Sequence, residues 1–459
     1  MEVGDRQRYI HKDESDGGGA SIRWTLVVLC GVYFFCLLSG YFLLRPIREG
    51  MGVQRGMADL RWLFLVTCGV SLVVTVAFGG VVSRLDRRRF LAIAQRVVVV
   101  CVLAFAFVRW RAGGEPGVWV GYVFYVWLSV VNLFLMSLFW GFMADIWSLA
   151  HAKRLFPVIG VGGTLGAIFG ATLAWTMAER IGVVWQLVFA AGMFEISSWV
   201  MAVIDRRSDS GAARVDNRRA PVGGRFRDGL IAVFGSPYLL GIGAYIALMA
   251  VSSTLVYFTG ANIVVDAEEE LESRIGLFAQ LDLWTQVATL LVQLFVTGQI
   301  IKRLGVGVAL CAMPIVTVAG FAVLAWVSGM GGVEGWQIFA VFAVFNAVHR
   351  ATRYAVIRPA RETLFSVVST GEKYKAKPIV DVFLYRGGDV AGTGVERLIA
   401  GAGIGLMGMV FAAVPLAVLW GGLGIALAWM QRRKAPAVGE GEGSSGIYSM
   451  QSGNAGERI

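Results

Sequence analysis

The sequence predicts an all-α polytopic membrane protein with about twelve transmembrane helices in two six-helix halves. Hydrophobic residues make up 57% of the 459 residues and charged residues only 16%, and the mean hydropathy is +0.67. The apolar residues gather in segments long enough to cross a hydrocarbon layer about 30 Å thick as a helix. Because only helices and closed barrels satisfy their own backbone polar groups in lipid, each segment is expected to be helical.

The apolar segments follow one another along the whole chain, with short polar loops between them. We expect spans near residues 24–52, 60–83, 90–108, 118–143, 155–178, 183–204, 236–262, 276–300, 305–328, 335–357, 378–400 and 404–430. An even number of spans places both termini on the same side of the membrane.

Basic residues alternate between loops and set the predicted orientation. The N-tail, the loop SRLDRRRF (83–90), the segment after the sixth span and the start of the C-tail are rich in Arg and Lys. The loop after the seventh span is acidic, with five carboxylates between 266 and 272. Since basic loops stay in the cytoplasm, both termini are predicted to be cytoplasmic, and the net charge of +10 needs no nucleic-acid partner to explain it.

A polar, basic segment divides the spans into two groups of six. The predicted organisation is a cytoplasmic N-tail at 1–22, an N-terminal half at 23–205, a basic cytoplasmic linker at 206–228, a C-terminal half at 229–434 and a cytoplasmic C-tail at 435–459. The C-tail is rich in Gly, Ser and Glu and is predicted to be disordered.

Two loops at matching places in the halves share a pattern. The loop after the second span reads FGGVVSRLDRRRF (78–90) and the loop after the eighth reads TGQIIKRLGVGVA (297–309). In both, a glycine precedes a tight basic turn. The pattern resembles the short cytoplasmic motif of the major facilitator superfamily. That resemblance implies two rocking halves with a substrate site between them near the middle of the membrane.

Four stretches resemble a more specific family, the ATP/ADP translocase-type nucleotide transporters of bacteria and plastids. They are YFLLRPIREGMG (41–52), LFWGFMADIW (138–147), AKRLFPVIGVGGTLG (152–166) and EKYKAKPIVDVFLYRGGD (372–389). The resemblance implies nucleotide exchange or import across a bacterial inner membrane. It also implies transport roles for the charged positions Arg48, Glu49, Asp145, Lys377 and Asp381.

The chain departs from that family at two places. The eleventh span has Arg386-Gly387-Gly388-Asp389 where the exchangers carry a Gly-Lys-Ser-Gly-like segment. The seventh span, ALMAVSSTLVYFTG at 247–260, has no acidic residue. Both departures bear on whether the chain performs strict ATP/ADP exchange.

Arginines inside apolar spans are the candidate substrate-binding residues. A charge in the bilayer is costly, and the planar guanidinium fork suits phosphate because it donates two parallel hydrogen bonds. The candidates are Arg45, Arg48, Arg350, Arg353 and Arg386. The alternative for Arg45 and Arg48 is anchoring at the end of the span, and Arg358 and Arg361 are interpreted as such anchors.

Carboxylates and a lysine form a second group of candidates, with roles in coupling or ion pairing. They are Glu49, Asp145, Glu195, Lys377, Asp381 and Asp389. Asp389 could belong to a substrate or proton-coupling cluster, or could simply pair with Arg386. Glu195 could carry a proton or pair with an arginine from another helix. Asp282 in the eighth span could face a cavity or make a packing hydrogen bond.

Small residues in the fifth span predict close helix packing. Gly162, Gly166 and Gly170 recur at every fourth position. No Walker lysine accompanies them, so packing is favoured over a phosphate-binding loop. The five cysteines lie in apolar spans and are interpreted as small apolar side chains.

The predicted function is secondary transport by alternating access, with a nucleotide or related phosphorylated anion as the substrate. The alternatives are a proton-coupled facilitator of another small solute and a non-transporting membrane sensor. We expect no enzymatic activity, because no nucleophile–base set is evident, and no cofactor or metal. The expected partners are the small-molecule substrate and the lipid bilayer, with the protein as a monomer and without nucleic acid.

Overall fold

The computed structural model describes residues 24–82, 87–113, 117–147, 149–209, 226–295, 297–330 and 332–444, and these residues are almost entirely helical. The predicted N-tail at 1–22 and most of the predicted linker, 210–225, lie outside the described residues. So does the end of the predicted C-tail, from residue 445 on.

The N-terminal half consists of six long helices. They are α2 (Trp24–Gly52), α3 (Met57–Val82), α4 (Arg87–Arg111), α5 (Val118–Ile146), α6 (Leu149–Ala178) and α7 (Val183–Asp209). Each contains one of the first six predicted spans.

The C-terminal half also has six spans, two of them divided. After the short helix α8 (Phe226–Gly235) it contains α9 (Pro237–Ala267), α10 (Leu271–Phe295), α11 (Thr297–Ser328), α12 (Gly335–Thr352) and α13 (Arg358–Leu364), then α14 (Thr370–Pro378), α15 (Tyr385–Gly401) and α16 (Gly405–Ser444). A π-helical turn, η1 (Arg353–Ile357), joins α12 to α13, and another, η3 (Ile379–Leu384), joins α14 to α15; the short 3-10 turn η2 (Phe365–Val367) follows α13. Helix α16 continues to Ser444, ten residues into the predicted disordered tail.

Ten of the described helices are long and apolar enough to cross a membrane. The other two spans, α12 with α13 and α14 with α15, carry charged residues and are interrupted by π-helical turns. Together they give the twelve spans that the hydropathy pattern predicts. The chain is a multi-pass α-helical membrane protein.

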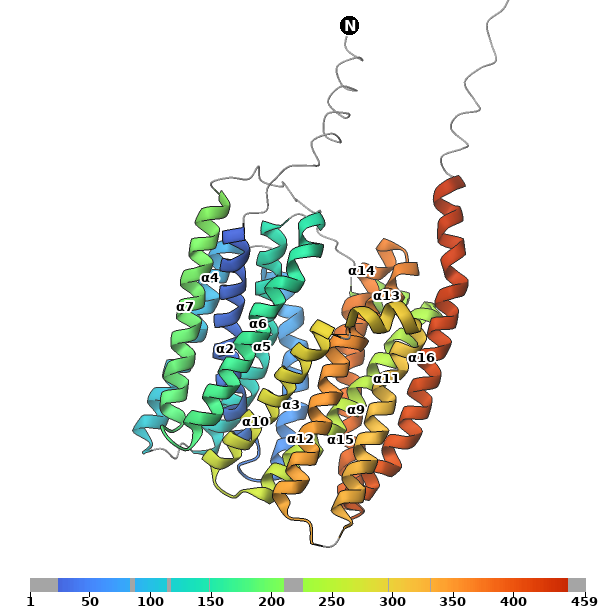
Figure 1. Ribbon diagram of the computed structural model, residues 1–459. Helices are drawn as coiled ribbons and strands as arrows, with labels where there is room; N and C mark the ends of the chain where they lie inside the picture. Colours follow the sequence, from blue (N-terminus) through green and yellow to red (C-terminus); the bar gives the residue numbers. More distant parts are fainter. Residues whose placement is uncertain are drawn as a thin grey trace, which may run out of the picture.

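The two halves stand side by side, with α3 and α10 between them (Figure 1). Helix α2 begins and α16 ends at the same end of the bundle, which we call the termini face; the other end is the far face. Helix α10 of the C-terminal half packs against α2 and α6 of the N-terminal half, and α3 packs against α15. These pairs hold the halves together.

Glycines allow α2 and α6 to lie in direct backbone contact. A Cβ atom at Gly162 would come within 2.6 Å of the Gly31 carbonyl oxygen, one at Gly166 within 2.2 Å of that of Phe35, and one at Gly170 within 2.4 Å of that of Ser39. No side chain fits in that space. The predicted packing role of this glycine series is confirmed.

The hydrophobic contacts between the halves lie toward the far face. One cluster of buried side chains includes Val53, Leu60 and Tyr125 from the N-terminal half and Phe258 and Phe342 from the C-terminal half. The other clusters are formed mainly within one half. The far face is therefore the closed side of the interface.

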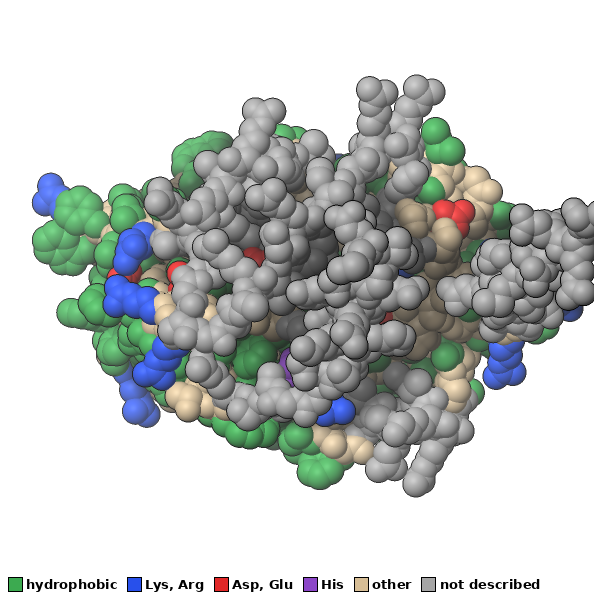
Figure 2. Space-filling view, turned by 90° about the horizontal axis from the view of Figure 1, so that it is seen from above, with side chains coloured by type: hydrophobic (Ala, Val, Ile, Leu, Met, Phe, Trp, Pro, Cys, Tyr) green, Lys and Arg blue, Asp and Glu red, His purple; other side chains and the backbone are tan. Residues whose placement is uncertain are grey.

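The termini face carries exposed basic side chains around its edge (Figure 2). The described residues of this kind include Arg154, Arg206, Arg207, Arg432 and Arg433. Large apolar side chains such as Trp199 and Phe411 remain exposed on the bundle's sides. This distribution fits a lipid-facing surface with a basic rim at one end.

Candidate functional site

A cavity between the halves brings the five predicted arginines together. It measures about 200 Å³ and is lined by Arg45, Arg48, Phe64, Ser253, Thr254, Val256, Tyr257, Asn346, His349, Arg350, Arg353, Tyr354, Tyr385, Arg386 and Asp389. We call it the central cavity. Its lining comes from α2 and α3 on one side and from α9, α12, η1 and α15 on the other, so both halves contribute.

The arginines of α2 face the cavity rather than anchor the end of the helix. Arg48 donates to the Ser129 hydroxyl at 3.0 Å, pairs with Glu49 and lies 5.0 Å from the centroid of the Tyr125 ring. Glu49 is buried and also accepts a 2.6 Å hydrogen bond from the hydroxyl of Tyr257 in the other half. The positioning of these side chains therefore depends on contact between the halves.

Asp282 is the central acidic partner that the sequence left open. It is buried on α10, where its Oδ1 pairs with Arg45 of the N-terminal half and accepts from Arg350 at 3.1 Å. Arg45 also lies 3.8 Å from Glu49. A single carboxylate thus holds one arginine from each half. The sequence feature that points to this role is an acidic residue, Asp282, inside an otherwise apolar span.

Arg353 differs from the other four arginines because its described partners are neutral. It donates to the Ser253 hydroxyl at 3.3 Å and to the Tyr385 hydroxyl at 2.6 Å. The guanidinium carbon lies 5.6 Å from the ring centroid of Tyr354 and 5.3 Å from that of Tyr385. No ion pair joins it to a carboxylate among the described residues, so its positive charge is the least compensated of the five.

Arg386 and Asp389 form the pair that the eleventh span predicts. Arg386 donates to Asp389 at 2.9 Å, and the Thr254 hydroxyl donates to the same carboxylate at 3.2 Å. Asp389 is buried, and both residues line the central cavity. Asp389 therefore pairs with Arg386 and also lines the central cavity, so the pairing does not exclude a position in the cavity.

A second cavity, about 480 Å³, continues from the central cavity toward the termini face. Arg353, Tyr354, Tyr385 and Arg386 line both cavities. We call this second space the termini-side cavity. Its other lining residues include Ser71, Thr75, Asn132, Arg358, Arg361 and Asp381.

Arg361, which was predicted to anchor the end of its span, instead forms an ion pair in the wall of the termini-side cavity. Its side chain is 13% exposed and lies 3.3 Å from Asp381. The predicted site residue Lys377 instead pairs with Glu362 at 2.6 Å, and both are more exposed.

Like Lys377, two further predicted residues do not line the cavities. Glu195 accepts a 2.7 Å hydrogen bond from the exposed indole of Trp199 on the same helix, so it faces outward from the bundle. Among the described residues, Glu195 has no arginine partner from another helix, and it does not line the central cavity. Asp145 is exposed near the end of α5 and does not line these cavities.

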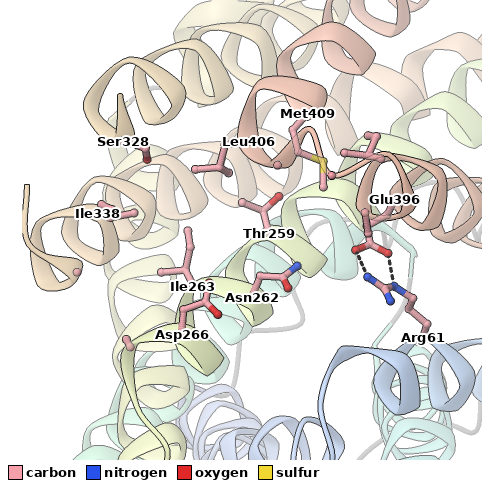
Figure 3. Close-up of a pocket in the computed structure, with 16 residues that line it drawn as sticks. Arg61, Thr259, Asn262, Ile263, Asp266, Ser328, Ile338, Glu396, Leu406 and Met409 are labelled. Atoms are coloured by element: carbon pink, nitrogen blue, oxygen red, sulfur yellow. Dashed lines mark hydrogen bonds and ion pairs between the residues drawn. The ribbon is translucent and has the colours of Figure 1, made fainter. Parts of the chain in front are cut away.

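Ion pairs that the sequence did not predict join the halves toward the far face. Arg61 of α3 donates two hydrogen bonds to the buried Glu396 of α15, at 2.5 and 2.8 Å (Figure 3). Arg109 of α4 donates to Glu272 of α10 at 3.0 Å. Among the described residues, no equivalent ion pair joins the halves near the termini face.

The central charges do not balance. Five arginines face the three carboxylates Glu49, Asp282 and Asp389, which leaves a net charge of +2. Aromatic side chains, among them Phe64, Tyr257 and Tyr354, line the same space. Chemically, the cavity suits a multiply charged anion that carries a flat ring.

No protein-family model matches the chain. In sequence it is similar to ADP,ATP carrier protein 1 of Chlamydia trachomatis, with 23% identity over 66% of this chain and 63% of the relative. It is also similar to the chloroplastic ADP,ATP carrier protein 2 of Arabidopsis thaliana, with 22% identity over 89% of this chain and 74% of the relative. Its relatives are ADP,ATP carrier proteins. The resemblance predicted from the four stretches is confirmed, although the chain spans less than two thirds of the length of the chlamydial relatives.

Solved structures with the same architecture are transporters. The nucleoside transporter NupG superposes with a TM-score of 0.56 at 13% identity, over 90% of this chain and 99% of its own. A bacterial homologue of the human lysosomal transporter Spinster, in an inward-facing and unoccupied conformation, gives 0.58 at 12% identity, over 91% and 99%. The chain shares the fold of these solved structures.

Proposed function

We propose that the protein is a secondary transporter that moves a nucleotide, or a related phosphorylated anion, by alternating access. The observation that carries the proposal is Arg353, which lies between two tyrosine rings at the junction of the two cavities. A phosphate there would meet a guanidinium that no described carboxylate already neutralises. The similarity to ADP,ATP carriers supports the same class of substrate.

The two joined cavities fit a long anion. The central cavity, about 200 Å³, holds the arginines and aromatic rings, and the termini-side cavity adds about 480 Å³ with Arg358 and Arg361 in its wall. A nucleotide that extends through both cavities would therefore lie beside arginines along its whole length, and its phosphates would lie among them. Bidentate contacts from guanidinium groups would distinguish phosphate from a simple carboxylate.

Substrate phosphate would compete with the protein's own carboxylates. Asp282 holds Arg45 and Arg350 when the site contains no substrate, and Arg45–Asp282 joins the two halves. A phosphate that takes over Arg45 would weaken this inter-half contact. Substrate binding would in this way favour the opening of the far face, because a ligand shifts a conformational equilibrium by its differential affinity for the two states.

The basic rim supports an orientation in which the termini face is cytoplasmic. The protein would then be open to the cytoplasm, in the inner membrane of a bacterium. One copy contains a complete central cavity, which supports a monomer as the working unit.

The alternatives receive less support. A proton-coupled carrier of another solute would use an acid inside the cavity. Glu195 faces outward and Asp145 does not line the cavities, while Asp389 lines the central cavity and is paired with Arg386. A membrane sensor that does not transport needs no pair of connected cavities such as the central and termini-side cavities. The relatives are carriers rather than enzymes.

The test is uptake of labelled ATP into proteoliposomes, with and without internal ADP and with and without a proton gradient. Arg353→Gln should reduce uptake at least tenfold, since about 1.5–3 kcal/mol is typical for a hydrogen bond to a charged group. Arg397→Gln, an exposed arginine on α15, is the matched control and should leave uptake unchanged. Uptake that survives Arg353→Gln would contradict the site, and no uptake of any nucleotide by folded protein would contradict the substrate class.

A further inference from the structure

A third cavity opens at the far face, away from the arginine cluster. It measures about 450 Å³ and lies among α9, α12, α15 and α16, with Arg61 of α3 at one edge (Figure 3). It shares no lining residue with the central cavity. Its size is within the ~300–1,000 Å³ range of small-molecule sites. We call it the far-side cavity.

The polar groups on its wall are mainly hydrogen-bond acceptors. The hydroxyl protons of Thr259 and Ser328 are already donated to carbonyl oxygens of their own helices, at 2.9 and 2.8 Å. The amide of Asn262 donates one N–H to the Phe258 carbonyl at 3.0 Å, which leaves its oxygen as an acceptor and its second N–H as a donor. These three groups therefore favour a ligand that brings its own N–H or O–H donors.

The charge of the cavity is negative. The carboxylate of Glu396 and the guanidinium of Arg61 neutralise each other through their two hydrogen bonds. Asp266 then remains at the mouth as the uncompensated charge, and it has no ion pair among the described residues.

The remaining wall is apolar. Ile263, Ile338, Leu406 and Met409 surround the space between the polar groups, with Ile263 from the same helix as Asn262 and Asp266 (Figure 3). A hydrophilic cation such as a metal ion would gain nothing from these side chains. An aliphatic or aromatic body would be removed from water there.

We propose that the far-side cavity is a binding site for a small amphipathic organic cation, a protonated amine on an apolar body. The ammonium group would lie at Asp266 with Asn262 and Thr259 as acceptors, and the apolar body would lie against Ile338 and Met409. The site is opposite in charge to the central cavity, so its ligand is a different compound from the transported anion.

The test uses three probes that share an apolar phenylalkyl group and differ in their polar head group: 4-phenylbutylammonium, 4-phenylbutanol and 4-phenylbutyrate. Their binding to the purified full-length protein is measured by calorimetry. The amine should bind at least tenfold more tightly than the alcohol, and the carboxylate more weakly than both. Asp266→Asn should weaken amine binding about tenfold without affecting the alcohol.

Two further variants locate the site. Glu268→Gln, an exposed acid outside the cavity wall, is the matched control and should leave binding unchanged. Ile338→Trp should fill the cavity and weaken binding of both the amine and the alcohol. Equal binding of amine and alcohol would overturn the proposal. So would preferred binding of the carboxylate, which Arg61 or the first turn of α16 would explain, or an amine affinity unchanged by Asp266→Asn.

Discussion

Replacing Glu396 by glutamine should open the far face. The Arg61–Glu396 pair joins α3 of one half to α15 of the other through two hydrogen bonds, at 2.5 and 2.8 Å. The side chain of Glu396 is 1% exposed and that of Arg61 is 20% exposed. The pair exists only while these two helices are in contact, so its loss destabilises that conformation alone.

The size of the effect follows from the burial of the pair. Breaking a fully buried ion pair costs about 3–5 kcal/mol. Arg61 is partly exposed and the glutamine oxygen can still accept one hydrogen bond, so about 1.5–3 kcal/mol is the better value. Since ~1.4 kcal/mol is a factor of ten, the ratio of closed to open protein should fall about 10- to 150-fold.

The measurement is the distance between spin labels across the far face. The labels are attached at Arg55 and Met330, which are exposed at the far end of different halves, after the five native cysteines have been replaced. Glu396→Gln should increase the long-distance population, and Glu268→Gln should not. The double exchange Arg61→Glu with Glu396→Arg should restore the short distance. An unchanged distance in Glu396→Gln, or an exchange that restores nothing, would refute the reasoning.

Three other changes test the packing, the central acid and an outlying acid. Gly166→Ala would place its Cβ 2.2 Å from a backbone oxygen of α2. It should cost about 1–3 kcal/mol and lower the thermal unfolding midpoint, whereas Gly160→Ala, which has open space around it, should not. Asp282→Asn should tighten nucleotide binding severalfold in calorimetry, because the anion no longer competes with a carboxylate for two arginines; weaker binding would show that Asp282 positions them instead. Glu195→Gln should change neither the rate nor the pH profile of uptake by more than about twofold, and a lost pH dependence would return Glu195 to the coupling mechanism.

The spans were predictable because the cost of unsatisfied backbone in lipid leaves few choices. The divided spans show where this reasoning ends. Hydropathy places the end of the tenth span at 357, but the helix continues past Pro359 to Leu364. Proline has no N–H and crowds the preceding turn, and the π-helical turn at 353–357 precedes it directly. A single-sequence pattern with a period of 3.6 residues does not reveal such a turn.

The arginines were predictable from the cost of burying charge, but their partners were not. Arg45 with Asp282, Tyr257 with Glu49, and Arg61 with Glu396 each join residues more than 200 positions apart. Periodicity tells which face of a helix a side chain occupies, and it does not tell which helix lies opposite. Arg61 and Glu396 lie near the ends of their helices, where an exposed charge is ordinary, so only the packing of α3 against α15 reveals that the glutamate is buried.

The distribution of partners around the five arginines gives an order to substrate binding. Four of them have a carboxylate partner, and displacing that carboxylate offsets part of what a phosphate gains. Arg353 has hydroxyl and ring partners instead and borders the termini-side cavity. In the proposed mechanism a phosphate that enters from the termini face therefore meets Arg353 before it competes with Asp282. Arg353→Gln should accordingly reduce the association rate of nucleotide, while Asp282→Asn should act mainly on its dissociation; stopped-flow binding separates the two, and the reverse assignment would contradict this order.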